Sequence, residues 1–162
     1  MTDLTAGHPL EAPHHLVGRR TVELGDDDRG RRLEVDVWYP AATGEYPQAS
    51  YELLPGVAFR SALALHQPPA MSGRWPLVLF SHGRTGMRIN YATFCEALAA
   101  RGAIVVSSDH PGDQLADWLS GNATDDRTNE IDRVADAHLV LHAMLHGHAA
   151  LPVDLLNAVD HQ

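Results

Sequence analysis

The sequence places a short apolar segment, 77–80, directly before Ser81-His82-Gly83. An apolar run of this length, preceded by a proline, is typical of a buried strand. Gly83 and Gly86 then predict a turn, and a turn after a strand leaves backbone N–H groups available to hold an anion. Acyl hydrolysis develops such a negative charge on a carbonyl oxygen, so this loop favours hydrolytic chemistry.

Nearby hydroxyl, imidazole and carboxyl groups allow a second arrangement. Ser81-His82 and Asp109-His110 each follow a predicted strand, and the carboxyl ends of neighbouring parallel strands lie close together. These residues could therefore form a serine–histidine–aspartate site. Because Ser81 is expected at the tail of a buried strand, we favour a structural role, in which Asp109 and His110 fix a turn through hydrogen bonds to the backbone.

Three histidines, His138, His142 and His146, are spaced four residues apart in a predicted helix. This spacing can chelate a metal ion, but no His-Glu-x-x-His motif supports a metalloprotease. We interpret the row as a histidine-rich helix surface and expect neither a metal nor another cofactor. Cys95 is the only cysteine, so no internal disulfide can form, and its place on an apolar helix face predicts a core residue.

The charge balance excludes some classes of partner. The 162 residues contain 12 arginines, no lysine and 21 acidic residues, which gives a net charge of −9. An acidic chain lacks the basic face that nucleic-acid binding needs. No window reaches the roughly 18 apolar residues of a membrane span, and residues 1–17 lack the basic and apolar regions of a signal peptide. We therefore expect a cytoplasmic protein without a nucleic-acid partner or a membrane span.

Two strands with a turn between them are predicted near the N-terminus. Residues 20–24 can form one strand, residues 25–30 carry a strong turn signal, and residues 33–39 alternate between apolar and polar side chains. Pro40 is expected to end the second strand. The resulting hairpin suits the antiparallel edge of a mixed sheet.

A strand, a helix and a second strand follow in the middle of the chain. The apolar run at 103–108 predicts a buried strand parallel to 77–80, and residues 90–100 predict the connecting helix. Asn90 is expected to cap this helix and Gly102 to end it. The predicted packing face of the helix consists of Tyr91, Phe94, Cys95 and Leu98.

The remaining segments are predicted from composition and periodicity. We expect a flexible lead at 1–17 and a single domain at 18–162. Residues 41–74, rich in proline, glycine and alanine, are expected to be irregular, with a short helix at 57–66. Such long connections often form lids or binding loops.

After a polar loop at 113–127, a helix is expected at 129–146, with Thr128 as its cap and Gly147 as its end. Its predicted packing face consists of Ile131, Val134, His138, Leu141 and Leu145.

Three motifs occur in an order that resembles the α/β-hydrolase superfamily. They are Val-Trp-Tyr-Pro at 37–40, Pro-Leu-Val-Leu-Phe-Ser-His-Gly at 76–83 and Asp-His-Pro-Gly at 109–112. Within that superfamily the chain is most similar to dienelactone-hydrolase-like and platelet-activating-factor-acetylhydrolase-like esterases, over about residues 20–146. The resemblance implies an α/β fold: the N-terminal part of the hydrolase sheet, an antiparallel hairpin plus parallel βαβ strands with flanking helices.

The resemblance also implies roles for the loop. The backbone N–H of Arg84 corresponds to an oxyanion-hole donor, Gly83 lets the substrate approach the backbone, and His82 shapes the loop rather than acting as a base. The expected substrate is a small-molecule carboxylic ester, and residues 44–74 are expected to supply part of the pocket wall.

The family's nucleophile is missing from the sequence. Esterases of this kind carry a serine in Gly-x-Ser-x-Gly, followed by an acid and a histidine, and none of the seven serines has that pair of glycines. In the family this motif follows a further strand, which would begin near Gln162. The resemblance thus implies a truncated hydrolase that is inactive alone. The alternative is a non-catalytic binding or assembly module that self-associates through the exposed edge of strand 77–80.

Overall fold

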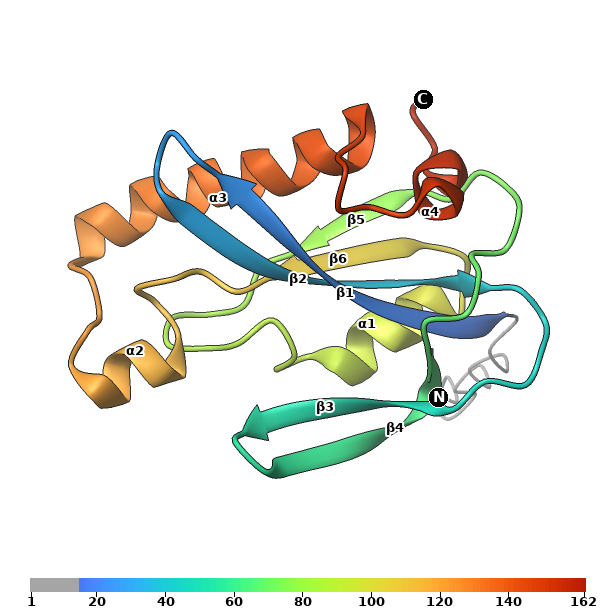
Figure 1. The fold of residues 1–162 in the computed structure, drawn as a ribbon, viewed down its shortest axis with the longest axis horizontal. Coiled ribbons are helices and arrows are strands. Elements are labelled where there is room, and N and C mark those ends of the chain that lie inside the picture. Colours follow the sequence, from blue (N-terminus) through green and yellow to red (C-terminus); the bar gives the residue numbers. More distant parts are fainter. Residues whose placement is uncertain (1–14) are drawn as a thin grey trace, which may run out of the picture.

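The computed structural model describes residues 15–162, which form a six-stranded sheet with four helices (Figure 1). A flexible lead was expected at 1–17. Residues 1–14 of this segment lie outside the described residues, and its last two residues, 16 and 17, belong to the first strand. The strands are β1 (Leu16–Asp26), β2 (Arg31–Ala41), β3 (Gln48–Leu54), β4 (Val57–His66), β5 (Leu77–Phe80) and β6 (Ile104–Ser108). The helices are α1 (Ala92–Ala99), α2 (Leu115–Ser120), α3 (Asp126–His146) and α4 (Val153–Ala158).

The sheet combines antiparallel and parallel pairs in the order β3-β4-β1-β2-β6-β5. β2 is antiparallel to both β1 and β6, while β5 pairs with β6 in parallel, with Leu77 opposite Ile104. The predicted α/β class, with a hairpin and a parallel βαβ unit, is therefore confirmed. β5 is the last strand at its end of the sheet.

The β1–β2 hairpin forms as predicted, but it lies inside the sheet rather than at its edge. Its turn includes Gly30, whose φ of +62° is readily adopted by glycine. A second hairpin, β3–β4, covers the outer side of β1, because Val17 of β1 pairs in parallel with Ala64 of β4. The expectation of an edge position was wrong because this second hairpin was not foreseen.

Pro40 lies within β2, opposite Val17, and does not end the strand as predicted. Proline has no N–H to donate to a neighbouring strand. However, β6 pairs with β2 only from Val35 to Trp38, so no carbonyl of β6 requires a donor at Pro40. The proline is accepted because it lies beyond the part of β2 that is paired on both sides.

The segment 41–74 is not irregular, and the short helix expected at 57–66 is wrong. Residues 48–66 form the β3–β4 hairpin, in which Tyr51 pairs with Phe59 and Gly56 has a φ of +78° in the turn. Alanine and leucine in β4 favour a helix by intrinsic propensity. Pairing with β3 and β1 overrides that preference, which is weak compared with tertiary contacts.

Helix α1 connects β5 and β6 as predicted, but its cap and its face differ from the expectation. Tyr91, not Asn90, is the N-cap residue, and it makes no side-chain capping bond. Tyr91 and Phe94, both expected in the core, are 57% and 53% exposed. The face that is buried consists instead of Ala92, Cys95, Glu96 and Ala99.

The polar loop expected at 113–127 contains a helix, α2, that the sequence analysis missed. The next helix, α3, begins after Asp125, whose side chain accepts a hydrogen bond from the Thr128 N–H, so Thr128 is not the cap. Gly147 ends α3 as predicted. The packing face expected for α3 was wrong, because Ile131 and Val134 are 62% and 60% exposed among the described residues. The residues of α3 that are buried are Asn129, Asp136, Val140, Ala143 and Met144.

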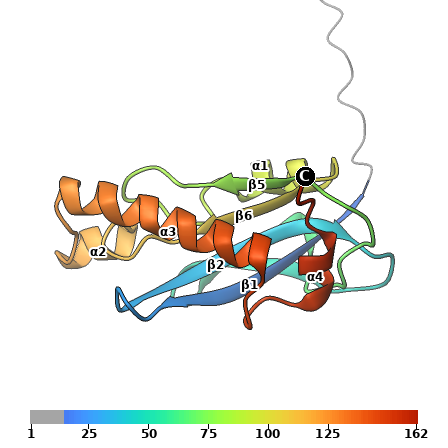
Figure 2. The ribbon, with the colours of Figure 1, turned by 90° about the horizontal axis from the view of Figure 1, so that it is seen from above.

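The core lies in two layers, one on each face of the sheet (Figure 2). On one face, side chains of α3 and α4 pack on Val35 and Val37 of β2. On the other, α1 packs on Trp38 of β2 and on the β3–β4 hairpin, through Cys95 and Tyr51 among others. No helix among the described residues is both long and apolar enough to cross a membrane.

Candidate active site

The loop after β5 contains a tight turn with one residue in a strained conformation. The Gly86 N–H donates to the Gly83 carbonyl oxygen at 3.0 Å, which closes a β-turn over Arg84 and Thr85. Thr85 has a φ of +56°, and among residues 15–162 only Gln67 shares this conformation without being a glycine. Non-glycine residues in the left-handed region cost energy and often mark functional sites.

The backbone N–H of Arg84 is available to a ligand. It has no hydrogen-bond partner within residues 15–162, and the Arg84 side chain points elsewhere, to an ion pair with Asp126. A Cβ added at Gly83 would meet no atom within 4 Å, so the space beside the turn is open. At Gly86 an added Cβ would come within 2.8 Å of the Gly83 oxygen, so this position requires glycine.

His82 is buried beneath the loop. Its Nδ1 donates to the Gly83 carbonyl oxygen at 2.7 Å, and its side chain is only 1% exposed. Burial lowers the pKa of His82, so the imidazole is neutral near pH 7 and its Nδ1 carries the proton. Its Nε2 has no partner in the part of the chain that the structure describes.

Arg133 of α3 and Asp113 bind the loop through hydrogen bonds. The Arg133 Nη1 donates to Asp113 Oδ2 at 2.6 Å, and its Nη2 donates to Ser81 Oγ at 2.9 Å and to the His82 carbonyl oxygen. Asp113 Oδ1 in turn accepts from the Thr85 N–H at 3.3 Å. Neither residue was predicted from the sequence, because Asp113 is 28 residues from Thr85 and Arg133 is 52 residues from Ser81 along the chain.

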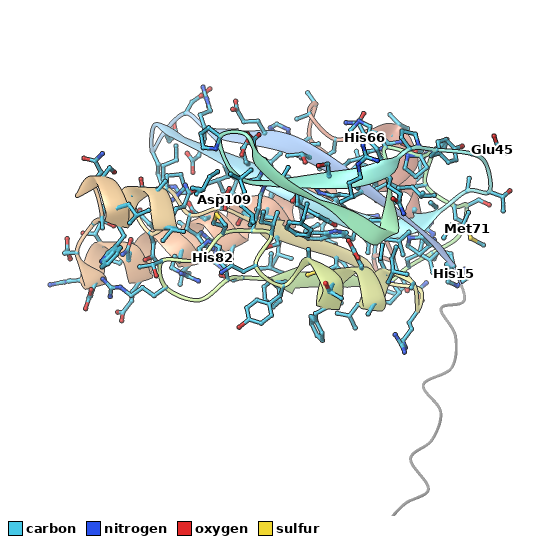
Figure 3. The ribbon with its side chains drawn as sticks, turned by 90° about the horizontal axis from the view of Figure 1, so that it is seen from below. His15, Glu45, His66, Met71, His82 and Asp109 are labelled. Atoms are coloured by element: carbon cyan, nitrogen blue, oxygen red, sulfur yellow. The ribbon has the colours of Figure 1, made fainter. Side chains whose placement is uncertain are left out.

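Ser81 and His110 do meet, but the acid beside them is Asp136 rather than Asp109. Ser81 Oγ lies 3.0 Å from His110 Nε2, and His110 Nδ1 lies 3.0 Å from Asp136 Oδ2. The side chain of His110 was expected to bind the backbone, but it contacts the side chains of Ser81 and Asp136 instead. Asp109 accepts instead from the Arg88 N–H at 2.8 Å. Figure 3 shows His82 and Asp109 close together in the left half of the view.

Asp136 is fully buried but strongly paired. Burial raises its pKa, yet hydrogen bonds from His110 and Arg31 and the charge of Arg31 outweigh this effect and lower the pKa to about 2. The Asp136 Oδ1 accepts from Arg29 Nη1 and Arg31 Nε, both at 2.9 Å. The carboxylate therefore stays ionised over the usual pH range and can only accept hydrogen bonds.

This pairing predicts a pH-dependent contribution to stability. Since the pKa of Asp136 is about 2 in the folded chain against an ordinary 3.8, its contribution is full above pH 4 and is lost as the pH falls through 2. The shift corresponds to about 2 kcal/mol. Urea unfolding of the wild type and of Asp136→Asn should therefore give free energies of unfolding that converge between pH 4 and pH 2. A difference that stays constant over this range would contradict the prediction.

A cavity of about 360 Å³ lies beside the loop. Its walls come from the tip of the β3–β4 hairpin, from the residues that follow the turn, and from α2. Its lining includes Leu53, Leu54 and Met87 and the charged residues Glu34, Glu52, Arg88 and Asp109. A larger cavity of about 440 Å³ is lined by His15, Leu63 and Ala100, among others. His15 lies far from His82, on the right of the view in Figure 3, and only the smaller of these two cavities is lined by residues that follow the turn, Met87 and Arg88.

The other candidate residues do not form a site. His138, His142 and His146 are exposed on α3, and only the rings of His142 and His146 are close, with centroids 4.7 Å apart. Within residues 15–162 no three metal-ligating side chains of the His, Cys, Asp or Glu type converge. Cys95 is buried as predicted, and burial raises its pKa to about 12, which leaves the thiol unreactive.

The mixed sheet, with helices on both faces and the loop at the end of β5, defines an α/β-hydrolase-like fold. A solved structure, the ferulic acid esterase from Streptomyces cinnamoneus, superposes with a TM-score of 0.66 at 23% identity over 83% of this chain. The chain spans 47% of that protein's length. At this identity the likeness concerns the fold alone.

The sequence model of one family, platelet-activating factor acetylhydrolase, isoform II, matches residues 57–138. This range is just over half of the chain, and the chain belongs to this family of esterase-type hydrolases. The matched range runs from β4 to α3 and includes the whole loop and the residues that hold it. The resemblance stated from the motifs is therefore confirmed.

Proposed function

We propose that residues 18–162 form the N-terminal portion of one α/β-hydrolase domain and supply the oxyanion-hole side of a serine-esterase active site. The observation that carries this proposal is the Arg84 N–H, which has no partner among residues 15–162 and is held on a strained turn at the carboxyl end of β5. The reaction is acyl transfer from a small-molecule ester to a serine and then to water. Arg84 donates to the carbonyl oxygen as its negative charge develops, an interaction worth ~3–4 kcal/mol.

The neighbours of Arg84 fit this role. The open space at Gly83 lets an ester carbonyl reach the turn, while His82 keeps the loop in shape from inside and does not act as a base. The adjacent cavity offers an ester both kinds of contact, because Leu53 and Leu54 of the β3–β4 hairpin line it together with charged residues such as Arg88 and Asp109. This supports the expectation that residues 44–74 provide part of the pocket wall.

The nucleophile must come from a Gly-x-Ser-x-Gly segment that the 162 residues do not contain. We therefore expect residues 1–162 alone to hydrolyse a short p-nitrophenyl ester no faster than buffer does. The release of p-nitrophenolate, followed at 1 µM and 10 µM protein, measures this. Sustained turnover that disappears in Ser81→Ala would contradict the expected inactivity. A Gly-x-Ser-x-Gly encoded within a few tens of codons after Gln162 would support the esterase proposal.

A second candidate function, a non-catalytic assembly module, is favoured by the end of the sheet at β5. On one side of β5, Phe80 packs on Tyr91 and Phe94, whose rings are more than half exposed. A strand edge beside an exposed apolar surface promotes association, either with a second copy through 77–80 or with the remainder of a hydrolase domain.

Sedimentation velocity distinguishes these outcomes. If the β5 edge pairs two copies, the wild type should form dimers that increase with concentration, and Phe94→Glu should remain monomeric because it places a charge beside the edge. Trp118→Glu is the matched control, since Trp118 is 61% exposed but belongs to α2. A wild-type monomer at all concentrations that unfolds cooperatively would count against self-association.

A further inference from the structure

Ser81, His110 and Asp136 form a hydrogen-bonded chain that the proposed oxyanion-hole loop does not require. From it we propose that Ser81 is a second nucleophile of this protein, one that captures activated phosphonyl groups covalently. The three residues come from the end of β5, the end of β6 and the middle of α3. This site differs from the family's nucleophile, which resides in a Gly-x-Ser-x-Gly motif.

The geometry has the features that activate a serine. The exposed Ser81 presents its Oγ 3.0 Å from His110 Nε2, and His110 itself is 1% exposed. Because the Asp136 carboxylate can only accept, His110 Nδ1, which lies 3.0 Å from Asp136 Oδ2, carries the proton of that hydrogen bond. His110 Nε2 is then free to accept the Ser81 hydroxyl proton, as a general base does.

Arginines hold both ends of this chain. Arg31 donates to both oxygens of Asp136, through Nε to Oδ1 at 2.9 Å and through Nη2 to Oδ2 at 2.8 Å, so the carboxylate cannot rotate away from His110. At the other end Arg133 Nη2 donates to Ser81 Oγ at 2.9 Å. The hydroxyl oxygen has two lone pairs, so one remains for attack while the guanidinium stabilises the developing negative charge.

The step can be written for a fluorophosphonate. Ser81 Oγ attacks phosphorus, an O–P bond forms, and the P–F bond breaks with its electron pair leaving on fluoride. The hydroxyl proton passes to His110 Nε2. The product is a stable phosphonate ester, so its formation requires no hydrolytic second step and agrees with the absence of turnover proposed above.

The test is to treat residues 1–162 with a biotinylated fluorophosphonate, followed by intact-mass analysis and peptide mapping. We expect one adduct per chain, on Ser81, and no adduct in Ser81→Ala. Ser120→Ala is the matched control, because Ser120 is an exposed serine of α2 whose hydroxyl binds a backbone carbonyl. It should label like the wild type. His110→Gln should label about 100-fold more slowly, because the general base is lost.

Asp136 acts through His110, so it is a positioning residue and needs a readout of its own. Imidazole ¹⁵N NMR of the wild type should show the His110 proton on Nδ1. In Asp136→Asn the amide can donate to Nδ1, which moves the proton to Nε2 and should slow labelling about 100-fold. A purely structural role for Asp136 would leave the tautomer unchanged. If Asp136→Asn fails to fold, as judged by circular dichroism, His110→Gln carries the test.

Several results would overturn the inference. They are no adduct at all, an adduct spread over several exposed serines and tyrosines, or labelling of Ser81 at the same rate in His110→Gln. Each of these leaves the oxyanion-hole proposal intact, since that proposal concerns the Arg84 N–H. Conversely, failure of the Arg84 test described in the Discussion leaves the Ser81 adduct unaffected.

Discussion

Replacement of Arg84 by proline should lower kcat for ester hydrolysis about 100- to 1000-fold in an enzyme that joins these residues to a Gly-x-Ser-x-Gly segment. Proline removes the N–H that we propose as the oxyanion donor, together with the Arg84 side chain. The turn accepts it, because Arg84 is the second residue of a turn whose third residue, Thr85, has a φ of +56°, as in type II turns. Proline is common at the second position of such turns. KM should change much less than kcat, since the donor acts mainly in the transition state.

Arg84→Ala is the control for this experiment, because alanine keeps the backbone N–H and removes the side chain that pairs with Asp126. That pair is exposed, so its loss should affect stability little. We expect Arg84→Ala to retain kcat within about threefold. Equal losses in Arg84→Ala and Arg84→Pro would assign the effect to the side chain and refute the proposed donor. Thermal unfolding of both variants establishes that the fold is intact.

Replacement of Asp136 by alanine should reduce the free energy of unfolding by about 3–5 kcal/mol. The carboxylate is fully buried and accepts hydrogen bonds from Arg29, Arg31 and His110, so its removal takes away the buried partner that these three groups share. The two arginine side chains are only 25% and 12% exposed, and the donors that faced Asp136 are then left without an acceptor in a place that water reaches poorly. Urea denaturation at pH 7 measures the effect.

Asp132→Ala is the matched control for that variant. Asp132 lies one helical turn before Asp136 on α3, and it pairs with the same arginines at 3.8 Å and 3.0 Å. Its side chain is 23% exposed, so water can replace the lost interaction and the cost should stay below about 1 kcal/mol. If both variants lose the same stability, the buried carboxylate has no special role and the interpretation is wrong.

The sequence predicted those elements whose signals are local. The apolar runs at 77–80 and 103–108, with a helix between them, indicated a parallel unit because continuous apolar strands are buried on both faces. The β3–β4 hairpin was missed because Ala and Leu in 57–66 favour a helix, and only pairing with β1 and β3 makes the segment a strand. Glycine and proline signals at 55 and 56 were present and could have revealed the turn.

The apolar faces of α1 and α3 were misplaced for a different reason. The periodicity identified rows of apolar residues, such as Ile131 and Val134, and such rows are expected to pack in the core. The structure instead buries polar residues of the same helix, among them Asp136, because arginines from the β1–β2 hairpin neutralise it. Ion pairs between segments about 100 residues apart leave no periodic signal in a sequence.

The candidate site was predictable to a similar extent. The motif at 81–83 located the loop, because a short run of residues fixes its shape, while the role of the Arg84 N–H as an oxyanion donor stays a proposal. The residues that hold the loop, Asp113 and Arg133, were not found, since their contact depends on how α3 crosses the sheet. His110 was noticed, but its partner Asp136 was not, for the same reason.

The pairing of β2 with β6 also bears on how quickly the chain can fold. Val35 of β2 pairs with Ser108 of β6, about 70 residues later, and β6 is the only strand that connects the hairpins to β5. Chains dominated by such distant contacts fold slowly, because the entropy of closing a long loop is lost before the contacts form. During synthesis, the edge of β2 that later pairs with β6 therefore has no partner until residue 108 has left the ribosome. Until then this core strand is exposed to other chains.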